Sequence, residues 1–130
     1  MGDRKKLQAP GRRALTAASV LFIVYGCLAL FVLSISILLT GTTLDFAFVV
    51  TFFYLFVLPL ATQIFAGIIG IIYCNNLEKA GLLLFMGIIA LFIALYHILG
   101  GTFLLFTGIP NLIFSIVYIY GAQKNLGALK

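Results

Sequence analysis

The stretch from residue 81 to residue 101, GLLLFMGIIALFIALYHILGG, is long and apolar enough to cross a lipid bilayer as a helix. About 20 apolar residues are needed for such a crossing. Small residues recur along the stretch at helical intervals, whereas Phe85, Met86, Phe92 and Ile93 lie off that line. A stripe of small side chains allows a second helix backbone to approach closely in lipid. We therefore interpret this stretch as the packing centre of a small membrane protein.

Composition excludes a water-facing fold. Of the 130 residues, 64% are hydrophobic and 8% are charged, whereas about 25% are charged in an ordinary soluble domain. The chain has too few polar groups to cover a surface in water, so the bilayer must act as its solvent. A chain of this length is expected to form one domain.

Four apolar runs, separated by short polar or glycine-containing breaks, predict four membrane-spanning helices. Connections this short make consecutive helices antiparallel neighbours. The predicted fold is therefore an all-α membrane protein, an antiparallel four-helix transmembrane bundle. Its expected parts are a basic arm at 1–13, a transmembrane domain at 14–122 and a polar tail at 123–130, with spans at about 14–39, 46–73, 80–99 and 103–122.

The basic residues orient this topology. All eight Lys and Arg residues fall in the arm, the 74–79 connection or the tail, which share one side. Basic loops stay on the cytoplasmic side of a membrane, so both termini are predicted to be cytoplasmic. The first apolar run is far longer than the core of a signal peptide, and we expect it to be kept as the first span.

The basic arm adjoins a membrane span, which favours anionic lipid headgroups over nucleic acid as its partner. Pro10 and Gly11 are expected to break any helix, so that the arm is mobile or lies on the headgroups. The expected headgroup contacts are Arg4, Lys5, Lys6, Arg12 and Arg13.

Each predicted span carries a face of small or polar residues at heptad-like spacing, which predicts left-handed helix crossings near about +20°. Pro59 is expected to kink the second span, and the aromatic run at 52–56 is expected to face lipid or a partner subunit. Tyr118 and Tyr120 are interpreted as anchors at the cytoplasmic boundary. We expect close helix packing at Ala66, Gly70, Gly87, Ala90 and Ala94.

The polar residues inside the spans are the candidates for a functional interior. Gln63 and Asn111 each follow a proline closely, and an amide in hydrocarbon must find partners. We expect them to form one hydrogen-bonded layer between the second and fourth spans, either as structural glue or, with Ser115, as a constriction in a pore.

His97 and Asp45 are expected at similar depth near the outer boundary. A contact between them would respond to external pH. The simpler alternatives are a hydrogen-bonded interfacial histidine and a carboxylate that caps the second span.

Several kinds of chemistry are missing from the spans. No Asp, Glu, Lys or Arg lies at mid-depth, whereas proton- and ion-coupled transporters usually carry such groups there. No nucleophile with a base, carboxylate pair or metal-ligand cluster is present, so we predict no catalytic site, cofactor or metal. Cys27 and Cys74 are expected to be separate buried thiols because they lie at different depths.

Two stretches, GIIGIIYCNNLEKAGLLLFMGIIAL and IPNLIFSIVYIYGAQKN, resemble a broad group of small four-span proteins of Gram-positive bacteria. Members often have Gly-rich second and third helices around a Lys-containing turn. Their closing pattern corresponds here to Pro110, Tyr118, Gly121, Ala122 and Lys124. The likeness covers about the last half of the chain. The group has no established activity, so the resemblance implies the four-span fold and a multi-pass location in the bacterial inner membrane.

Three functional hypotheses follow. The first is a non-enzymatic accessory or scaffold subunit that acts through helix contacts, as a homo-oligomer or within a larger membrane complex. The alternative is a small oligomeric channel or transporter for a neutral or weakly polar solute, lined by Gln63, Asn111 and Ser115. The third, with the least support, is a membrane enzyme that uses His97 and Asp45.

Overall fold

The fold is that of a computed structural model, which describes residues 9–40, 45–99 and 102–129, and all of their side chains except those of residues 40 and 102–107. These residues form helices and short connections, without a strand among them. The helices are α1 (Arg12–Thr40), α2 (Phe46–Phe52), α3 (Leu58–Tyr73), α4 (Ala80–Leu99) and α5 (Thr102–Leu129), with a π-helical segment, η1 (Phe53–Val57), between α2 and α3 and a 3₁₀ turn, η2 (Leu77–Lys79), before α4.

Three helical rods are long and apolar enough to cross a membrane, namely Arg12–Leu39, Phe46–Tyr73 and Leu77–Leu99. Each exceeds the roughly 20 residues that a hydrocarbon core requires. The prediction of an all-helical membrane protein is therefore confirmed.

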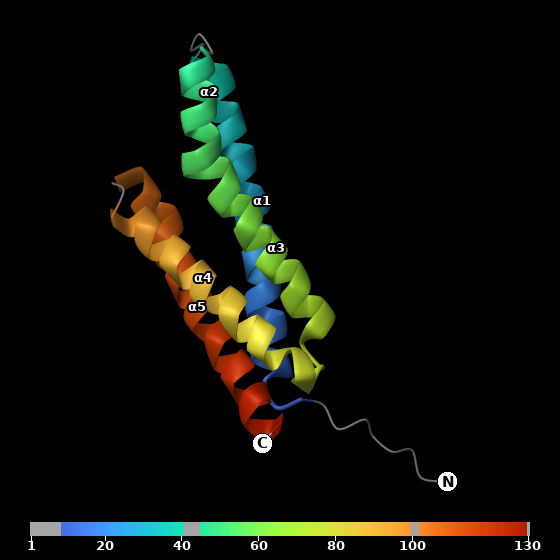
Figure 1. The fold of residues 1–130 in the computed structure, drawn as a ribbon. Helices are drawn as coiled ribbons and strands as arrows, with labels where there is room; N and C mark the ends of the chain where they lie inside the picture. The colour runs from blue at the N-terminus through green and yellow to red at the C-terminus, as the bar shows by residue number, and fades with distance from the viewer. Residues whose placement is uncertain (1–8, 41–44, 100–101, 130) are drawn as a thin grey trace.

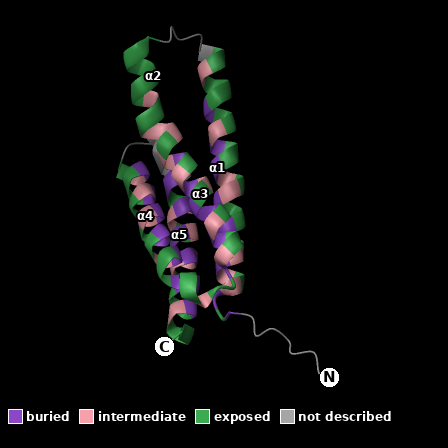
Figure 2. Ribbon diagram, turned by 45° about the vertical axis from the view of Figure 1, so that its right-hand side comes forward, coloured by how far each residue is buried: buried purple, intermediate pink, exposed green. Residues whose placement is uncertain are grey.

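The helices pack in a definite order. The antiparallel helices α4 and α5 contact each other most extensively, α1 contacts α3 and α5, and α3 also contacts α4. Residues 9–11 and the end of α5 lie at the same end of the molecule, and α1 and α2 extend beyond α4 and α5 at the opposite end (Figure 1). Figure 2 shows that α1 and α2 diverge there.

The stripe of small residues on α4 faces inward, as its spacing indicated. Gly87, Ala90, Ala94 and His97 are all buried. Met86, which was expected to lie off the stripe, is buried as well, with 8% of its surface exposed. The reason is that α4 contacts both α3 and α5, so its buried face is wider than a single line of small residues.

The proline in the second rod is accommodated without ending the helix. Pro59 has no N–H to donate and its ring would crowd the carbonyl four residues earlier. The turn before it widens into η1, where the Leu58 amide donates to the Phe53 carbonyl. Such π segments are a known cause of helix bending, and the rod changes direction between α2 and α3 (Figure 1).

Two helix ends differ from the expected limits. α1 begins at Arg12, inside the expected arm, and α5 continues to Leu129 through the expected tail. The expected breaks at 41–43 and 100–101 lie outside the described residues. Both cysteines are free, but Cys27 is exposed on α1 and only Cys74 is buried. The prediction of a buried Cys27 is wrong because it lies between two inward positions, Gly26 and Ala29.

Candidate functional site

A hydrogen-bonded polar layer joins three helices in the interior. Gln63 of α3 donates from Nε2 to Asn111 Oδ1 of α5 over 3.0 Å. The same nitrogen donates to the backbone carbonyl of Phe22 in α1 over 3.2 Å. Gln63 and Asn111 are each only 2% exposed. The structure thus brings together the two amides that follow the prolines in the sequence, and α1 joins them.

Ser115 and Tyr118 extend this layer along α5. Ser115 donates from Oγ to the Asn111 carbonyl of its own helix over 2.7 Å. The Tyr118 hydroxyl donates to the Ala66 carbonyl of α3 over 3.0 Å, and the Tyr118 ring lies 5.6 Å from the Phe22 ring of α1. Both side chains are completely buried. Tyr118 therefore links the same three helices by one hydrogen bond and one ring contact.

The interpretation of Tyr118 as an anchor at the membrane boundary is wrong. Tyr118 lies one heptad after Asn111, on the inward face of α5, and its hydroxyl finds its partner on α3. Tyr120 points the other way and is half exposed, with the Lys124 ammonium 4.8 Å from the centre of its ring. Burial of a tyrosine requires a hydrogen-bond partner, and the Ala66 carbonyl supplies it.

Glycines create the space that the layer occupies. A Cβ added to Gly70 would collide with Ser19 Oγ and would lie 2.7 Å from the Tyr118 ring. A Cβ added to Gly87 on α4 would lie 2.8 Å from Ile119 and 2.9 Å from the Tyr118 ring. Contacts this short have no room for a side chain, so these glycines mark where α3 and α4 approach α1 and α5. Ala66, Ala90 and Ala94, the other expected packing residues, are buried on the same helices.

Two polar atoms in this region have no partner among the described residues. Asn111 Nδ2 and Ser19 Oγ are both buried and make no hydrogen bond there. A buried donor without a partner costs about 1–3 kcal/mol. The layer therefore holds hydrogen-bonding capacity that packing alone does not use.

The contact between His97 and Asp45, one of the alternatives for these two residues, is not formed. Asp45 is exposed and caps α2, accepting from the Phe48 amide over 2.7 Å. His97 is buried on α4, and neither ring nitrogen has a hydrogen-bond partner in the described part of the chain. The two residues are not at the same depth because α2 begins well beyond the end of α4 (Figure 1). Asp45 thus caps α2, as the simpler alternative predicted. The simpler alternative for His97, a hydrogen-bonded interfacial histidine, is wrong, because the ring is buried without a hydrogen-bond partner among the described residues.

A second polar cluster, which sequence reasoning missed, closes the end of the molecule that carries residues 9–11. Asn125 of α5 donates from Nδ2 to the Cys74 carbonyl over 3.0 Å and accepts from the Gly11 amide over 2.7 Å. Asn75 accepts from the Ala9 amide over 2.7 Å. We call these three hydrogen bonds the asparagine clasp. One signal could have revealed it, because Asn125 lies one heptad after Tyr118 on the inward face of α5.

The clasp corrects the expectation of a loose arm. Ala9 and Gly11 are buried, and the backbones of Gly11 and Gly121 cross so closely that a Cβ on Gly121 would lie 2.9 Å from the Gly11 carbonyl and from Leu15. Residues 9–11 are therefore held against α5. Pro10 and Gly11 precede the helix as predicted, but the backbone amides of Ala9 and Gly11 donate to asparagines of other segments.

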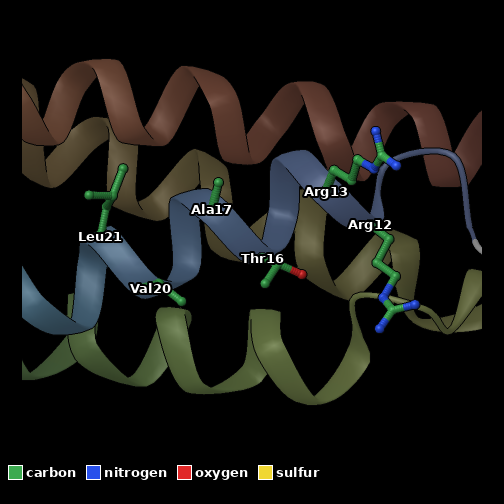
Figure 3. Close-up of a pocket in the computed structure, with 6 residues that line it drawn as sticks. All are labelled: Arg12, Arg13, Thr16, Ala17, Val20 and Leu21. Atoms are coloured by element: carbon green, nitrogen blue, oxygen red, sulfur yellow. The ribbon is translucent and has the colours of Figure 1, made fainter.

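The expected headgroup contacts are divided by the described range. Arg4, Lys5 and Lys6 lie outside the described residues. Arg12 and Arg13 form the first turn of α1, where Arg12 is partly exposed and Arg13 is exposed. They border a groove on the outer face of that helix (Figure 3).

No family model, curated protein or solved structure matches this chain. Its chemistry must therefore be judged from its own residues. Within the described residues, no group of three His, Cys, Asp or Glu side chains could hold a metal ion. The interior instead offers amides and hydroxyls, which can hold helices in register or bind a small polar molecule.

Proposed function

We propose that this protein is a non-enzymatic accessory or scaffold subunit that acts through helix contacts in the membrane. Its partners are further copies of itself or a larger membrane complex. Two observations support this. The polar side chains of the interior bond to one another and to a helix carbonyl, which serves to fix helix positions. A large aromatic surface at the opposite end is mostly exposed among the described residues.

The proposed setting is an antiparallel four-helix transmembrane bundle with both termini in the cytoplasm. The contacts of α1 with α3 and α5, and of α4 with the same two helices, support the bundle. The basic residues at one end support the orientation. The resemblance to small four-span proteins of Gram-positive bacteria supports α5 as the fourth span and the bacterial inner membrane as the location.

The exposed surface of α2 and η1 is the observation that carries the proposal, although Phe52 and Phe56 pack in part against Ala29, Leu33 and Leu60. Neither element has a buried residue. Phe46 is 85% exposed and Tyr54 is 65% exposed, while α1 diverges from α2 at this end (Figure 2). Aromatic side chains are enriched where proteins bind one another. We call this surface, formed by residues 46–57, the aromatic arm.

Site-specific photocrosslinking in native membranes tests the proposal. A photoreactive amino acid at position 54 is expected to give a crosslinked product of defined mass, because the aromatic arm lies against a protein partner. Phe92 on α4 supplies the matched control, since its exposed fraction, 66%, is close to the 65% of Tyr54. The same label at position 92 is expected to give lipid adducts alone. Lipid adducts alone at both positions, with monomers in mild detergent, would contradict the proposal.

A second candidate function is a small oligomeric channel or transporter for a neutral or weakly polar solute. The observation that favours it is the unused hydrogen-bonding capacity of Asn111 Nδ2 and Ser19 Oγ in the interior. A solute path there would be lined by Gln63, Asn111 and Ser115. The direct bond of 3.0 Å between the first two would have to open.

Flux into liposomes separates this candidate from the scaffold. Asn111→Leu removes one of the three polar groups that would line the path, so a channel would change its flux of urea or glycerol. Thr62→Val is the control, because Thr62 bonds within its own helix and lies outside the layer. Equal flux for protein-free liposomes, wild type and Asn111→Leu would eliminate the channel.

A further inference from the structure

The outer face of α1 carries a groove where the charged start of the helix meets its apolar part. The groove is open to the surroundings and has a volume of about 630 Å³. Its lining residues all belong to the first turns of α1: Arg12, Arg13, Thr16, Ala17, Val20 and Leu21. We call it the α1 groove.

Two rows of side chains at i, i+4 spacing frame the α1 groove, one from Arg12 to Val20 and one from Arg13 to Leu21. Residues at this spacing are neighbours on a helix surface. Figure 3 shows the first row on the side of α3 and the second on the side of α5. Each row passes from an arginine through a short side chain to an aliphatic one. The space above the short side chains is thus charged at one end and apolar at the other.

We propose that the α1 groove binds one acidic phospholipid. The guanidinium groups of Arg12 and Arg13 and the hydroxyl of Thr16 would hold the phosphate, and one acyl chain would lie over Ala17 toward Leu21. A guanidinium fork matches the geometry of phosphate oxygens. The apolar half of the groove selects a lipid over a soluble anion, because an inorganic phosphate has nothing to place there.

The charges around the groove support this occupant. Neither the Arg12 nor the Arg13 guanidinium makes a hydrogen bond or ion pair with another described residue, and the only bond of Arg12 to such a residue outside its own helix is from its backbone amide to Ala9. The other two described basic side chains at this end are differently placed, with the Lys79 ammonium 5.9 Å from the centre of the Tyr73 ring and Lys124 over Tyr120. The two arginines at the groove therefore differ from the two lysines at this end, whose ammonium groups lie near aromatic rings.

Lipid binding to the purified full-length protein tests the proposal. Native mass spectrometry would compare phosphatidylglycerol with phosphatidylcholine of the same acyl chains. Near a membrane surface each basic residue contributes about fivefold to anionic lipid binding, so Arg12→Gln with Arg13→Gln is expected to lower phosphatidylglycerol binding roughly thirtyfold. Lys79→Gln with Lys124→Gln removes the same charge and is expected to lower phosphatidylglycerol binding by much less than thirtyfold, because neither lysine lines the groove.

A third variant tests the acyl chain separately from the charge. Ala17→Phe fills the middle of the groove and leaves the net charge unchanged. Because Ala17 is exposed, the fold is expected to survive, and circular dichroism checks this. Binding of phosphatidylglycerol is expected to fall about tenfold, which corresponds to losing the contacts of one or two methylene groups. Equal losses in the two charge pairs, or unchanged binding in Ala17→Phe, would each overturn the proposal.

Discussion

The two ends of this molecule are built on opposite principles. At the end with residues 9–11, the asparagine clasp ties these residues to α5 and to the turn after α3. At the opposite end, α2 and η1 bury no residue. The last packing there is a small cluster of Ala29, Leu33 and Leu60. Beyond that cluster α1 and α2 separate (Figure 2).

The difference shows what holds helices together when the solvent is lipid. Burying an apolar side chain against protein gains little if its alternative is a lipid tail. Close backbone approach and satisfied polar groups must then supply the specificity. The clasped end has both, in the Gly11–Gly121 crossing and in Asn125. Among the described residues the aromatic arm has neither, and it contacts the rest of the fold through partly buried side chains such as Phe52 and Phe56.

The largest effect is expected from filling the tight interior. Gly70→Ala places a Cβ against Ser19 Oγ and the Tyr118 ring, and such overpacking costs about 3 kcal/mol of unfolding free energy. Gly81→Ala is the matched control because nothing lies within 4 Å of its added Cβ. Unfolding in mixed micelles, followed by circular dichroism, compares the two. Equal stability for both variants would mean that α3 does not approach α1 and α5 this closely.

Breaking the clasp is expected to have the next largest effect. Asn125→Leu removes the acceptor of the Gly11 amide and the donor to the Cys74 carbonyl, which costs about 2–3 kcal/mol because two backbone groups lose their partner. Gln123→Leu, at an exposed neighbouring position, is expected to be near neutral.

Hydrogen exchange locates the effect of Asn125→Leu. The Gly11 amide is expected to exchange faster in this variant and to remain protected in Gln123→Leu. Asn125→Asp keeps an acceptor for that amide but loses the donor to Cys74, so its protection should be intermediate. Fast exchange at Gly11 in the wild type would show that the clasp is open.

The sequence predicted the helical class well and the interior in part. Periodicity located the inward faces of α3 and α5, because a polar group in the membrane must be hydrogen-bonded within the protein and therefore faces its interior. Gln63 and Asn111 are the clear case, since their amides had to find a partner. The participation of Phe22 was not predictable, because any backbone carbonyl of α1 offers the same acceptor.

The predictions that failed concern segments in which the sequence pattern does not constrain the fold. Asn75 and Asn125 lie in segments polar enough to be solvated, so nothing in their composition distinguished a clasp from a loop or tail. Asp45 and His97 lie near the outer ends of consecutive predicted spans, which predicts a similar depth. The structure has α1 and α2 extending beyond α4 and α5 (Figure 1), which separates them.

A smaller effect is expected from uncoupling the polar layer. Gln63→Leu and Asn111→Leu, made singly and together, form a double-mutant cycle in the same unfolding assay. Hydrogen bonds between membrane helices contribute about 0.6 kcal/mol on average and at most about 1.7 kcal/mol, and the 3.0 Å bond should fall within that range. A coupling energy of zero would mean that the two amides are bonded to water or to a solute instead, which would favour the channel over the scaffold.

The smallest effect on stability is expected at the aromatic arm. Tyr54→Ala truncates a ring that is 65% exposed, and surface substitutions of this kind change the free energy of unfolding by less than about 0.5 kcal/mol. Leu60→Ala, in the adjacent buried cluster, should cost about 2 kcal/mol because it leaves a cavity. The scaffold proposal predicts that Tyr54→Ala weakens the association of the protein with itself or with its complex. The stability of the monomer should stay unchanged. A large loss of monomer stability in Tyr54→Ala would mean that the aromatic arm packs within the fold of the monomer. It would then not be available as a surface for partners.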